Sequence, residues 1–344
     1  MKTLKKLLVA LLAISMLAGC GGGSDEDPVL VIYSPNSDTE VDNIIPAFEE
    51  ATGIEVQLIS AGTGECTARL DAEKENPQCD VMFGGVNLGV ITQFPDIFQE
   101  YDSPNEKGID ENYQTEDGYL HNYMLSGSGC LILNNDIIAD LGLTGEINGY
   151  ADLLNPKLKG KIAAGDPTKS SSAWAELTNM LLVMGDEPYD DKAWEFVEDF
   201  IVQLDGVQLD SSSAIYKGVS AGEYAVGVSY EDPCVALVAS GADVTVVYPE
   251  EGAVWLPTAS AIVKDCPHPE NAKKFIDFLL SKDCQEIIGG LTIRGTMSSI
   301  TPSNKYMKPF KDIKVVYEDL ELTAKNKTDW QQKYANLKAT HDSK

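Results

Sequence analysis

Three consecutive serines, Ser170, Ser171 and Ser172, stand at the predicted start of a helix in the stretch KSSSAWAEL. Serine hydroxyls donate hydrogen bonds, and so do the unpaired N–H groups of a helix start, where the helix dipole also places positive charge. Together these groups can hold an anion such as a phosphoryl group without a lysine or an arginine. The same serines also suit an ordinary N-cap, so this turn alone is compatible with either role.

Comparable turns follow other apolar stretches of the chain. They are residues 34–38 (SPNSD), 60–65 (SAGTGE), 83–87 (FGGVN), 165–173 (GDPTKSSSA), 210–214 (DSSSA) and 230–233 (YEDP). Four of the six are rich in Ser, Thr, Asn or Gly, and none continues into the G-K-[ST] of a phosphate-binding P-loop. Because parallel α/β sheets bind ligands at the carboxyl ends of their strands, the turns together favour a neutral anion site.

The YEDP turn has a different chemistry, because Glu231 and Asp232 are adjacent carboxylates at the end of a predicted strand. They can accept hydrogen bonds from sugar hydroxyls, pair with an ammonium group, or only complement the dipole of a helix start. The motifs GxSxG and HExxH are missing, and the three histidines stand in unrelated contexts. We therefore expect a binding protein and not an enzyme, with no cofactor and no resident metal.

The N-terminal segment has the features of a secretory signal peptide. Lys2, Lys5 and Lys6 precede an apolar run at residues 7–18 that is too short to span a membrane. The segment ends in LAGC, which resembles a bacterial lipobox and implies cleavage before Cys20 and a diacylglycerol on its sulfur. Residues 1–19 would then be removed and residues 20–28 would form a flexible polar tether. The alternative is an ordinary signal peptide with a chance cysteine.

The remaining body of roughly 320 residues is long enough for two domains. Loss of the three leader lysines takes the net charge from −28 to −31. A protein this acidic binds nucleic acid and anionic lipid poorly, so we expect no nucleic-acid partner and membrane contact through the lipid anchor only. We expect the mature body to be soluble, since no later stretch reaches about 18 apolar residues.

Six cysteines follow Cys20. Cys266 and Cys284 flank a predicted helix of about 20 Å, which a disulfide cannot bridge, and another predicted helix separates Cys66 from Cys79. The sequence does not decide whether Cys130 and Cys234 form a disulfide. We expect mostly free, buried thiols.

Apolar strands and amphipathic helices alternate along the body. Strands are predicted at 29–33, 54–60 and 79–85, with helices at 39–53 and 63–76 between them. A second set of strands and helices begins near residue 161, a further strand lies at 258–263, and a helix at 269–281 precedes a polar helical tail. Strand–helix–strand alternation predicts parallel sheets with right-handed crossovers. Two such units, joined by crossings near 125–130 and 250–258, would leave a cleft between them.

Several stretches together resemble the extracytoplasmic solute-binding proteins of ABC importers. They are the lipobox and residues 31–56, 62–85, 155–177, 216–233 and 268–286. The resemblance is to the branch that includes binders of ferric ion, hexose phosphate and 2-aminoethylphosphonate. It implies an α/β, two-domain periplasmic-binding-protein fold of type II, with parallel-rich sheets, two crossover segments and a central cleft. We expect residues 29–128 and 254–310 in the first domain, 129–253 in the second, and a helical tail, 311–344, packing on the first.

The resemblance also implies a lipid-anchored, extracytoplasmic monomer that captures a small anion, a sugar phosphate or a phosphonate, and passes it to an ABC permease in the membrane. The substrate-binding residues that it implies are Ser34, Asn36, Ser37, Thr63, Gly64, Ser170, Ser171, Ser172, Asp210, Ser211, Tyr230 and Glu231. Glu231 would contact the polar end of the ligand and the serine run its phosphate. A histidine that the hexose-phosphate binders carry near position 210 is absent here.

Two other ligands stay open. A ferric ion would use Tyr230 and Glu231 with a bound anion, although the text VSYEDP lacks the neighbouring tyrosine pair typical of ferric binders. A cation such as thiamine or a polyamine would use acidic and aromatic residues and would leave the serine turns without a role.

Overall fold

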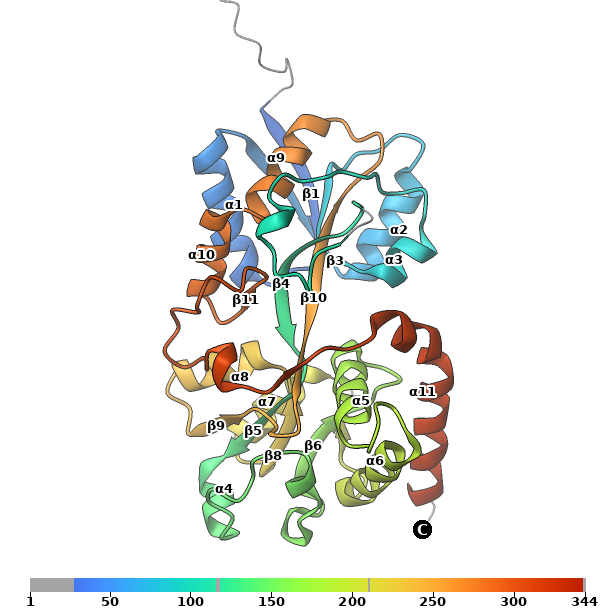
Figure 1. Ribbon diagram of the computed structural model, residues 1–344, viewed down its shortest axis with the longest axis vertical. Helices are drawn as coiled ribbons and strands as arrows, with labels where there is room; N and C mark the ends of the chain where they lie inside the picture. The colour runs from blue at the N-terminus through green and yellow to red at the C-terminus, as the bar shows by residue number, and fades with distance from the viewer. Residues whose placement is uncertain (1–27, 116–117, 210, 343–344) are drawn as a thin grey trace, which may run out of the picture.

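The structure is a computed structural model that describes residues 28–115, 118–209 and 211–342 of the chain. These residues form two α/β domains stacked along the long axis of the molecule and joined at a waist (Figure 1). The signal peptide, Cys20, nearly all of the tether and Asp210 lie outside the described residues. Within the described residues, no helix is both long enough and apolar enough to cross a bilayer.

The first domain is built on a mixed sheet with the strand order β11-β4-β10-β3-β1-β2, with β12 paired to β10. Its strands are β1 (Val29–Ser34), β2 (Glu55–Ser60), β3 (Val81–Val86), β4 (His121–Gly127), β10 (Ala253–Ile262), β11 (Arg294–Gly295) and β12 (Val315–Val316). Its helices are α1 (Asp38–Thr52), α2 (Thr63–Glu73), α3 (Leu88–Gln93), α9 (Pro269–Leu279) and α10 (Lys282–Gly290). In Figure 1, α1, α9 and α10 lie on one side of this sheet and α2 and α3 on the other.

The core of the first domain explains why α1 is a helix. Its apolar residues recur at helical spacing, and Ile44 and Phe48 are fully buried. The Phe48 ring meets Phe275 of α9 edge-on with the ring centroids 5.0 Å apart, and Phe275 meets Phe83 of β3 at 5.2 Å. Gly53 ends the helix in the left-handed region, at a φ of 73°, as its glycine predicts.

The second domain has a smaller sheet with the order β7-β6-β8-β5-β9. Its strands are β5 (Cys130–Asn134), β6 (Ile162–Gly165), β7 (Gln208–Leu209), β8 (Val226–Ser229) and β9 (Val244–Val247). Its helices are α4 (Asn135–Asp140), α5 (Ser171–Val183), α6 (Asp191–Leu204), α7 (Ser212–Ser220) and α8 (Glu231–Ala239). Short 3₁₀ turns occur at Glu106–Gly108, Ala151–Leu154, Pro156–Leu158 and Phe310–Asp312.

Strand register turns the carboxyl ends of the second sheet toward the waist. The chain crosses between the domains from β4, which ends at Gly127, to β5, which begins at Cys130. Cys130 pairs with Ser229, the last residue of β8, so the carboxyl end of β8 lies at this crossing. Because β6 runs parallel to both β7 and β8, the turns after all three strands lie at the same edge.

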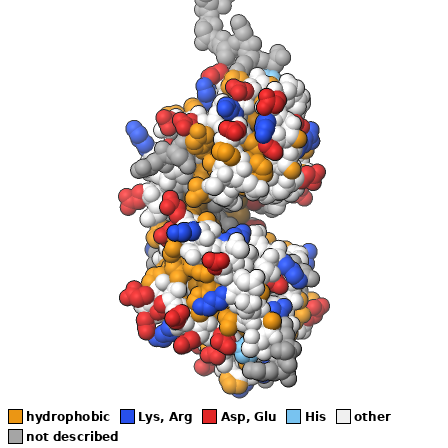
Figure 2. Space-filling model, turned by 90° about the vertical axis from the view of Figure 1, so that its right-hand side faces the viewer, with side chains coloured by type: hydrophobic (Ala, Val, Ile, Leu, Met, Phe, Trp, Pro, Cys, Tyr) orange, Lys and Arg blue, Asp and Glu red, His pale blue; other side chains and the backbone are white. Residues whose placement is uncertain are grey.

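The first sheet presents its carboxyl ends to the same waist. β1 runs parallel to β2 and β3, and its last residue, Ser34, pairs with Ser60. The chain returns from the second domain into β10 at Ala253, and Val86 at the end of β3 pairs with Ala259 of β10. Figure 2 shows the surface hollowed at this waist, between the two domains. The polar turns of both domains therefore face one interdomain cleft.

The expectation that the tail packs on the first domain was wrong. After β12, which pairs in parallel with the start of β10, the chain crosses the waist a third time. It ends in α11 (Leu320–Asp342), which lies along α6 of the second domain (Figure 1). The aromatic side chains of α11 decide this position: Trp330 packs on Tyr189 at a centroid distance of 5.2 Å. A polar helical pattern indicates a helix but does not identify the surface that it covers.

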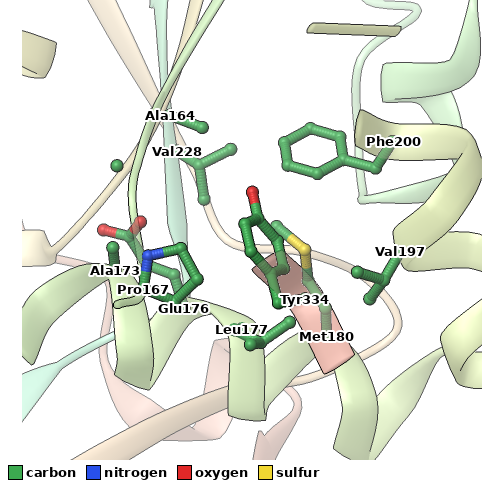
Figure 3. A pocket seen from close by; sticks show the side chains of 11 residues that line it. Ala164, Pro167, Ala173, Glu176, Leu177, Met180, Val197, Phe200, Val228 and Tyr334 are labelled. Carbon is green, nitrogen blue, oxygen red and sulfur yellow. The ribbon is translucent and has the colours of Figure 1, made fainter. Parts of the chain in front are cut away.

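Tyr334 of α11 is deeply embedded in the second domain. It is 3% exposed, and Figure 3 shows it pointing between the side chains of α5 and α6. The labelled neighbours are Leu177, Met180, Val197 and Phe200. The tail is therefore part of the second domain's core.

Tyr334→Ala should lower the free energy of unfolding by about 3 kcal/mol, because it removes a buried aromatic ring and leaves a cavity. Lys325→Ala, at an exposed position of the same helix, should change it by less than about 0.5 kcal/mol. Urea unfolding followed by circular dichroism measures both. Equal effects of the two substitutions would contradict the packing of α11 described above.

Candidate ligand site between the two domains

Ser34 and Asn36 form the centre of the first domain's half of the cleft. The Ser34 hydroxyl is fully buried, donates to the carbonyl of Phe83 at 2.7 Å and accepts from the N–H of Asn36 at 3.1 Å. Asn36 in turn donates from Nδ2 to the hydroxyl of Tyr123 at 2.8 Å. Ser34 therefore holds the turn that presents Asn36, and its own hydroxyl is already used.

Two glycines at the end of β3 allow the neighbouring loops to approach closely. Gly84 and Gly85 have φ angles of 83° and 72°, in the left-handed region that other residues rarely adopt. A Cβ atom on Gly84 would lie 2.1 Å from Oδ1 of Asn36, and one on Gly85 would lie 2.8 Å from Oγ1 of Thr63. The register thus gathers Asn36 and Thr63, whereas Gly64 of α2 has open space around it.

Glu40 joins this half of the site and was missed from the sequence. Ser37, the N-cap of α1, donates its hydroxyl to the Glu40 carboxylate. Glu40 is 7% exposed, and burial raises its pKa although the Ser37 hydrogen bond opposes the shift. The spacing Ser37-Asp-Thr-Glu40 is that of a capping box, which could have marked Glu40 as a turn residue.

A small pocket of about 70 Å³ brings Glu40 together with the start of α8 across the domain boundary. It is lined by Glu40, Met124, Leu125, Ser126, Gly127, Tyr230, Glu231, Asp232, Thr292 and Ile293. Burial also raises the pKa of Asp232, against a hydrogen bond from Thr292. The negative charge of Asp232 further raises the pKa of Glu40. The pocket therefore favours protonation of Glu40 and Asp232, or a bound cation beside them, over two ionised carboxylates without a counter-charge.

Glu231 also begins α8, but its carboxylate is turned toward the first domain. Oε2 accepts from Nε of Arg294 at 2.7 Å and from the Trp255 indole at 3.1 Å. Oε1 accepts from the second guanidinium nitrogen at 2.5 Å and from the Tyr248 hydroxyl at 2.5 Å. Glu231 and Arg294 are 2% and 1% exposed. A contact between Glu231 and a ligand hydroxyl, as the sequence predicted, would require this ion pair to open.

The serine run lies at the start of α5, at the carboxyl edge of the second sheet. Ser170 is the N-cap, and its hydroxyl accepts from the N–H of Ala173 at 3.3 Å. Ser171 is exposed and Ser172 is half-buried. Neither their hydroxyls nor their N–H groups have a partner among the residues that the structure describes. One serine therefore caps the helix, and two leave their donors available.

Ser211 and Tyr230 complete the same edge. Ser211 precedes α7 and shares a 2.8 Å hydrogen bond with the hydroxyl of Ser213. Tyr230 precedes α8, and its ring meets that of Tyr216 at a centroid distance of 6.2 Å. Burial raises the pKa values of both tyrosine hydroxyls, so both are neutral phenols. Tyr216 was missed because the fold, and not a shared motif, pairs it with Tyr230.

All six cysteines of the described chain are buried thiols. Cys130 begins β5 and Cys234 lies in the first turns of α8, and the neighbouring Cys234 together with burial raises the pKa of the Cys130 thiol. A Cys130–Cys234 disulfide is therefore not formed in this structure.

Comparison with known proteins identifies the family. Residues 43–314 match the bacterial extracellular solute-binding proteins. The chain belongs to this family. Its members bind solutes and do not transform them, so this solute-binding protein is the extracytoplasmic component of an ABC importer and passes a small ligand to a membrane permease.

Three similar proteins match this solute-binding protein over most of its length. A periplasmic protein of Salmonella typhimurium named for binding 2-aminoethylphosphonate is 24% identical over 315 residues, which are 87% of this chain and 88% of the relative. AfuA of Actinobacillus pleuropneumoniae, solved with fructose-6-phosphate, is 24% identical with a TM-score of 0.68, and the match covers 89% of this chain and 96% of AfuA. Ferric iron-binding protein A of Mannheimia haemolytica, in an open conformation, is 19% identical with a TM-score of 0.73. The match covers 90% of this chain and 98% of that protein. The predicted periplasmic-binding-protein fold is confirmed.

Arg294→Met should lower the free energy of unfolding by about 3–5 kcal/mol, because it leaves the Glu231 carboxylate buried without its counter-charge. The double variant Glu231→Leu/Arg294→Met should regain a large part of that loss, since no buried charge remains. Urea unfolding of the single and double variants measures the coupling. Lys282→Met, which removes an exposed ion pair with Glu286, is the control and should cost less than about 1 kcal/mol. A silent Arg294→Met would contradict the assigned ion pair.

Proposed function

We propose that this solute-binding protein captures a small organic phosphate or phosphonate in the interdomain cleft. The observation that carries the proposal is the start of α5, where Ser171 and Ser172 offer hydroxyls and N–H groups without partners in the described chain. Phosphoryl oxygens accept such donors, and the helix dipole adds positive charge. The ligands named for two relatives, 2-aminoethylphosphonate and fructose-6-phosphate, belong to this class.

Within this class, the acidic pocket favours a solute whose other end is an amine. Glu40 from the first domain and Asp232 from the second line one pocket, and both have a raised pKa. An ammonium group placed there would supply the missing positive charge and donate hydrogen bonds to both carboxylates. A sugar hydroxyl would donate hydrogen bonds without relieving the repulsion between them. An aminoalkyl phosphonate therefore fits the cleft better than a sugar phosphate.

Ferric ion is the second candidate, and the Tyr216–Tyr230 pair supports it. Fe³⁺ prefers hard oxygen ligands such as phenolate and carboxylate, and Asp232 lies two residues beyond Tyr230. Glu231, the other ligand predicted for iron, is already held by Arg294. A thiamine or polyamine would suit the acidic pocket and leave the serines of α5 unused.

We also propose that the mature protein is a monomer anchored by a lipid on Cys20. The signal peptide and the LAGC ending support the anchor. An anchored tether would keep the cleft within reach of the permease.

Ser171→Asp should abolish binding of 2-aminoethylphosphonate, because it sets a carboxylate against the phosphonate at the start of α5. Ser171→Ala should weaken binding about tenfold, the usual effect of losing one hydrogen bond to a charged group. Aspartate is favourable in the first turn of a helix, so the melting temperature without ligand should stay nearly constant. Isothermal titration calorimetry with 2-aminoethylphosphonate, fructose-6-phosphate and ferric citrate tests all three ligands. Unimpaired binding of either phosphorus compound by Ser171→Asp would refute the site.

Affinity for 2-aminoethylphosphonate should rise with pH as Glu40 and Asp232 ionise. Their pKa values are raised in the unliganded protein, and a bound ammonium favours the ionised forms, so binding releases protons from the carboxylates. Asp232→Asn should weaken binding about tenfold and flatten this pH dependence. Because the phosphonate also titrates, the difference between wild type and Asp232→Asn is the relevant quantity. Identical pH profiles for the two proteins would exclude an amine in the pocket.

A further inference from the structure

A second cavity, of about 130 Å³, shares only one lining residue with the Glu40–Asp232 pocket of the ligand cleft. Its lining residues are Asp110, Tyr113, Leu125, Gly295, Thr296, Ser298, Phe310, Val315 and Tyr317. Six of these belong to the first domain, and Phe310, Val315 and Tyr317 belong to the segment between residues 310 and 319, which passes in front of β10 in Figure 1 before α11 begins. Leu125 is the one residue that it shares with the Glu40–Asp232 pocket.

Aromatic rings make up much of the wall. Tyr113 and Tyr317 lie with ring centroids 6.0 Å apart and an interplanar angle of 55°. Phe310 adds a third ring, and the guanidinium of Arg294 lies 4.4 Å from its centroid. The charge of Arg294 is balanced by Glu231, so it does not give the cavity a net positive charge.

The polar side chains of the cavity are one carboxylate, Asp110, and the hydroxyls of Tyr113, Thr296, Ser298 and Tyr317. Asp110 accepts from the N–H and the side-chain amide of Asn112 at 3.0 and 2.8 Å. Burial opposes ionisation of Asp110, but these hydrogen bonds outweigh it and lower its pKa, so its carboxylate is charged. Tyr113 is 7% exposed, and its hydroxyl has no hydrogen-bond partner among the described residues.

We propose that this cavity binds a small organic cation of the methylated ammonium class. Tyrosine faces attract such a cation through their π-electrons, more strongly when the cation is desolvated. Asp110 supplies the opposing charge, and the unpartnered Tyr113 hydroxyl can accept or donate one hydrogen bond to a polar substituent on the ligand. An anion is disfavoured because the charged group in the lining is a carboxylate, Asp110.

This site is independent of the proposed cleft ligand. Its carboxylate, Asp110, and its aromatic walls contribute nothing to the start of α5 or to the Glu40–Asp232 pair. Variants of the cleft and of the cavity can therefore be tested against each other on the same protein.

The experiment titrates the mature protein with choline and, separately, with 3,3-dimethylbutan-1-ol, its neutral isostere of nearly equal shape. Isothermal calorimetry and line broadening of the ligand methyl signals in NMR report binding. Choline should bind saturably at one site and the alcohol at least about tenfold more weakly, since only the cation interacts with the rings and Asp110. Tyr317→Ala and Asp110→Asn should each weaken choline about tenfold. Tyr317 is 52% exposed, so its loss should leave the fold intact.

Cleft variants supply the matched controls. Asp232→Asn and Ser171→Asp should leave choline binding unchanged. The proposal is overturned by any of three results: no saturable choline binding at concentrations on the order of 10 mM, equal binding of the alcohol, or choline binding that survives Tyr317→Ala and is lost in Asp232→Asn. The last result would place the cation in the cleft.

Discussion

The arrangement of the cleft depends on one buried ion pair, Glu231 with Arg294. A carboxylate taken out of water is costly unless charge and hydrogen bonds replace its hydration. Here four donors from three side chains, Arg294, Tyr248 and Trp255, satisfy both oxygens of Glu231. Glu231 is the first residue of α8. The helix start that presents Tyr230 to the cleft is thereby fixed to β11 in the other domain.

This contact restricts how the two domains can move. It lies beside the crossings, since Trp255 is in β10 and pairs with Gly127 at the end of β4. Separating a buried pair costs several kcal/mol, which is a large share of a typical domain's stability. Closure around a ligand is therefore expected to rotate the domains about this contact and to keep it intact. The small pocket between Glu40 and Asp232 lies next to that axis, where its shape changes least.

The sequence predicted the features that local patterns encode. Strands at 29–33 and 54–60 and the helix at 39–53 agree with β1, β2 and α1 to within about a residue, because apolar periodicity and Gly53 define them. The strand-end turns do gather at the waist, as parallel strands require. The partner of Glu231 could not be predicted, because Arg294 is 63 residues away and only the packed fold joins them. The predicted position of the tail was wrong for the same reason. The packing of α11 on α6 depends on Trp330 and Tyr334, whose partners only the fold brings together.

The site also shows how a strongly acidic protein can hold an anion. With a net charge of −28 its long-range field repels anions, but at physiological ionic strength charges more than about 8 Å apart are largely screened. What acts on a ligand inside the cleft is therefore the local set of groups. At the start of α5 these are dipoles and hydroxyls, while at the start of α8 they are carboxylates. A cleft with donors at one helix start and acceptors at another prefers a ligand that carries a negative group and a positive group at the matching distance. The excess of surface carboxylates has little part in that preference.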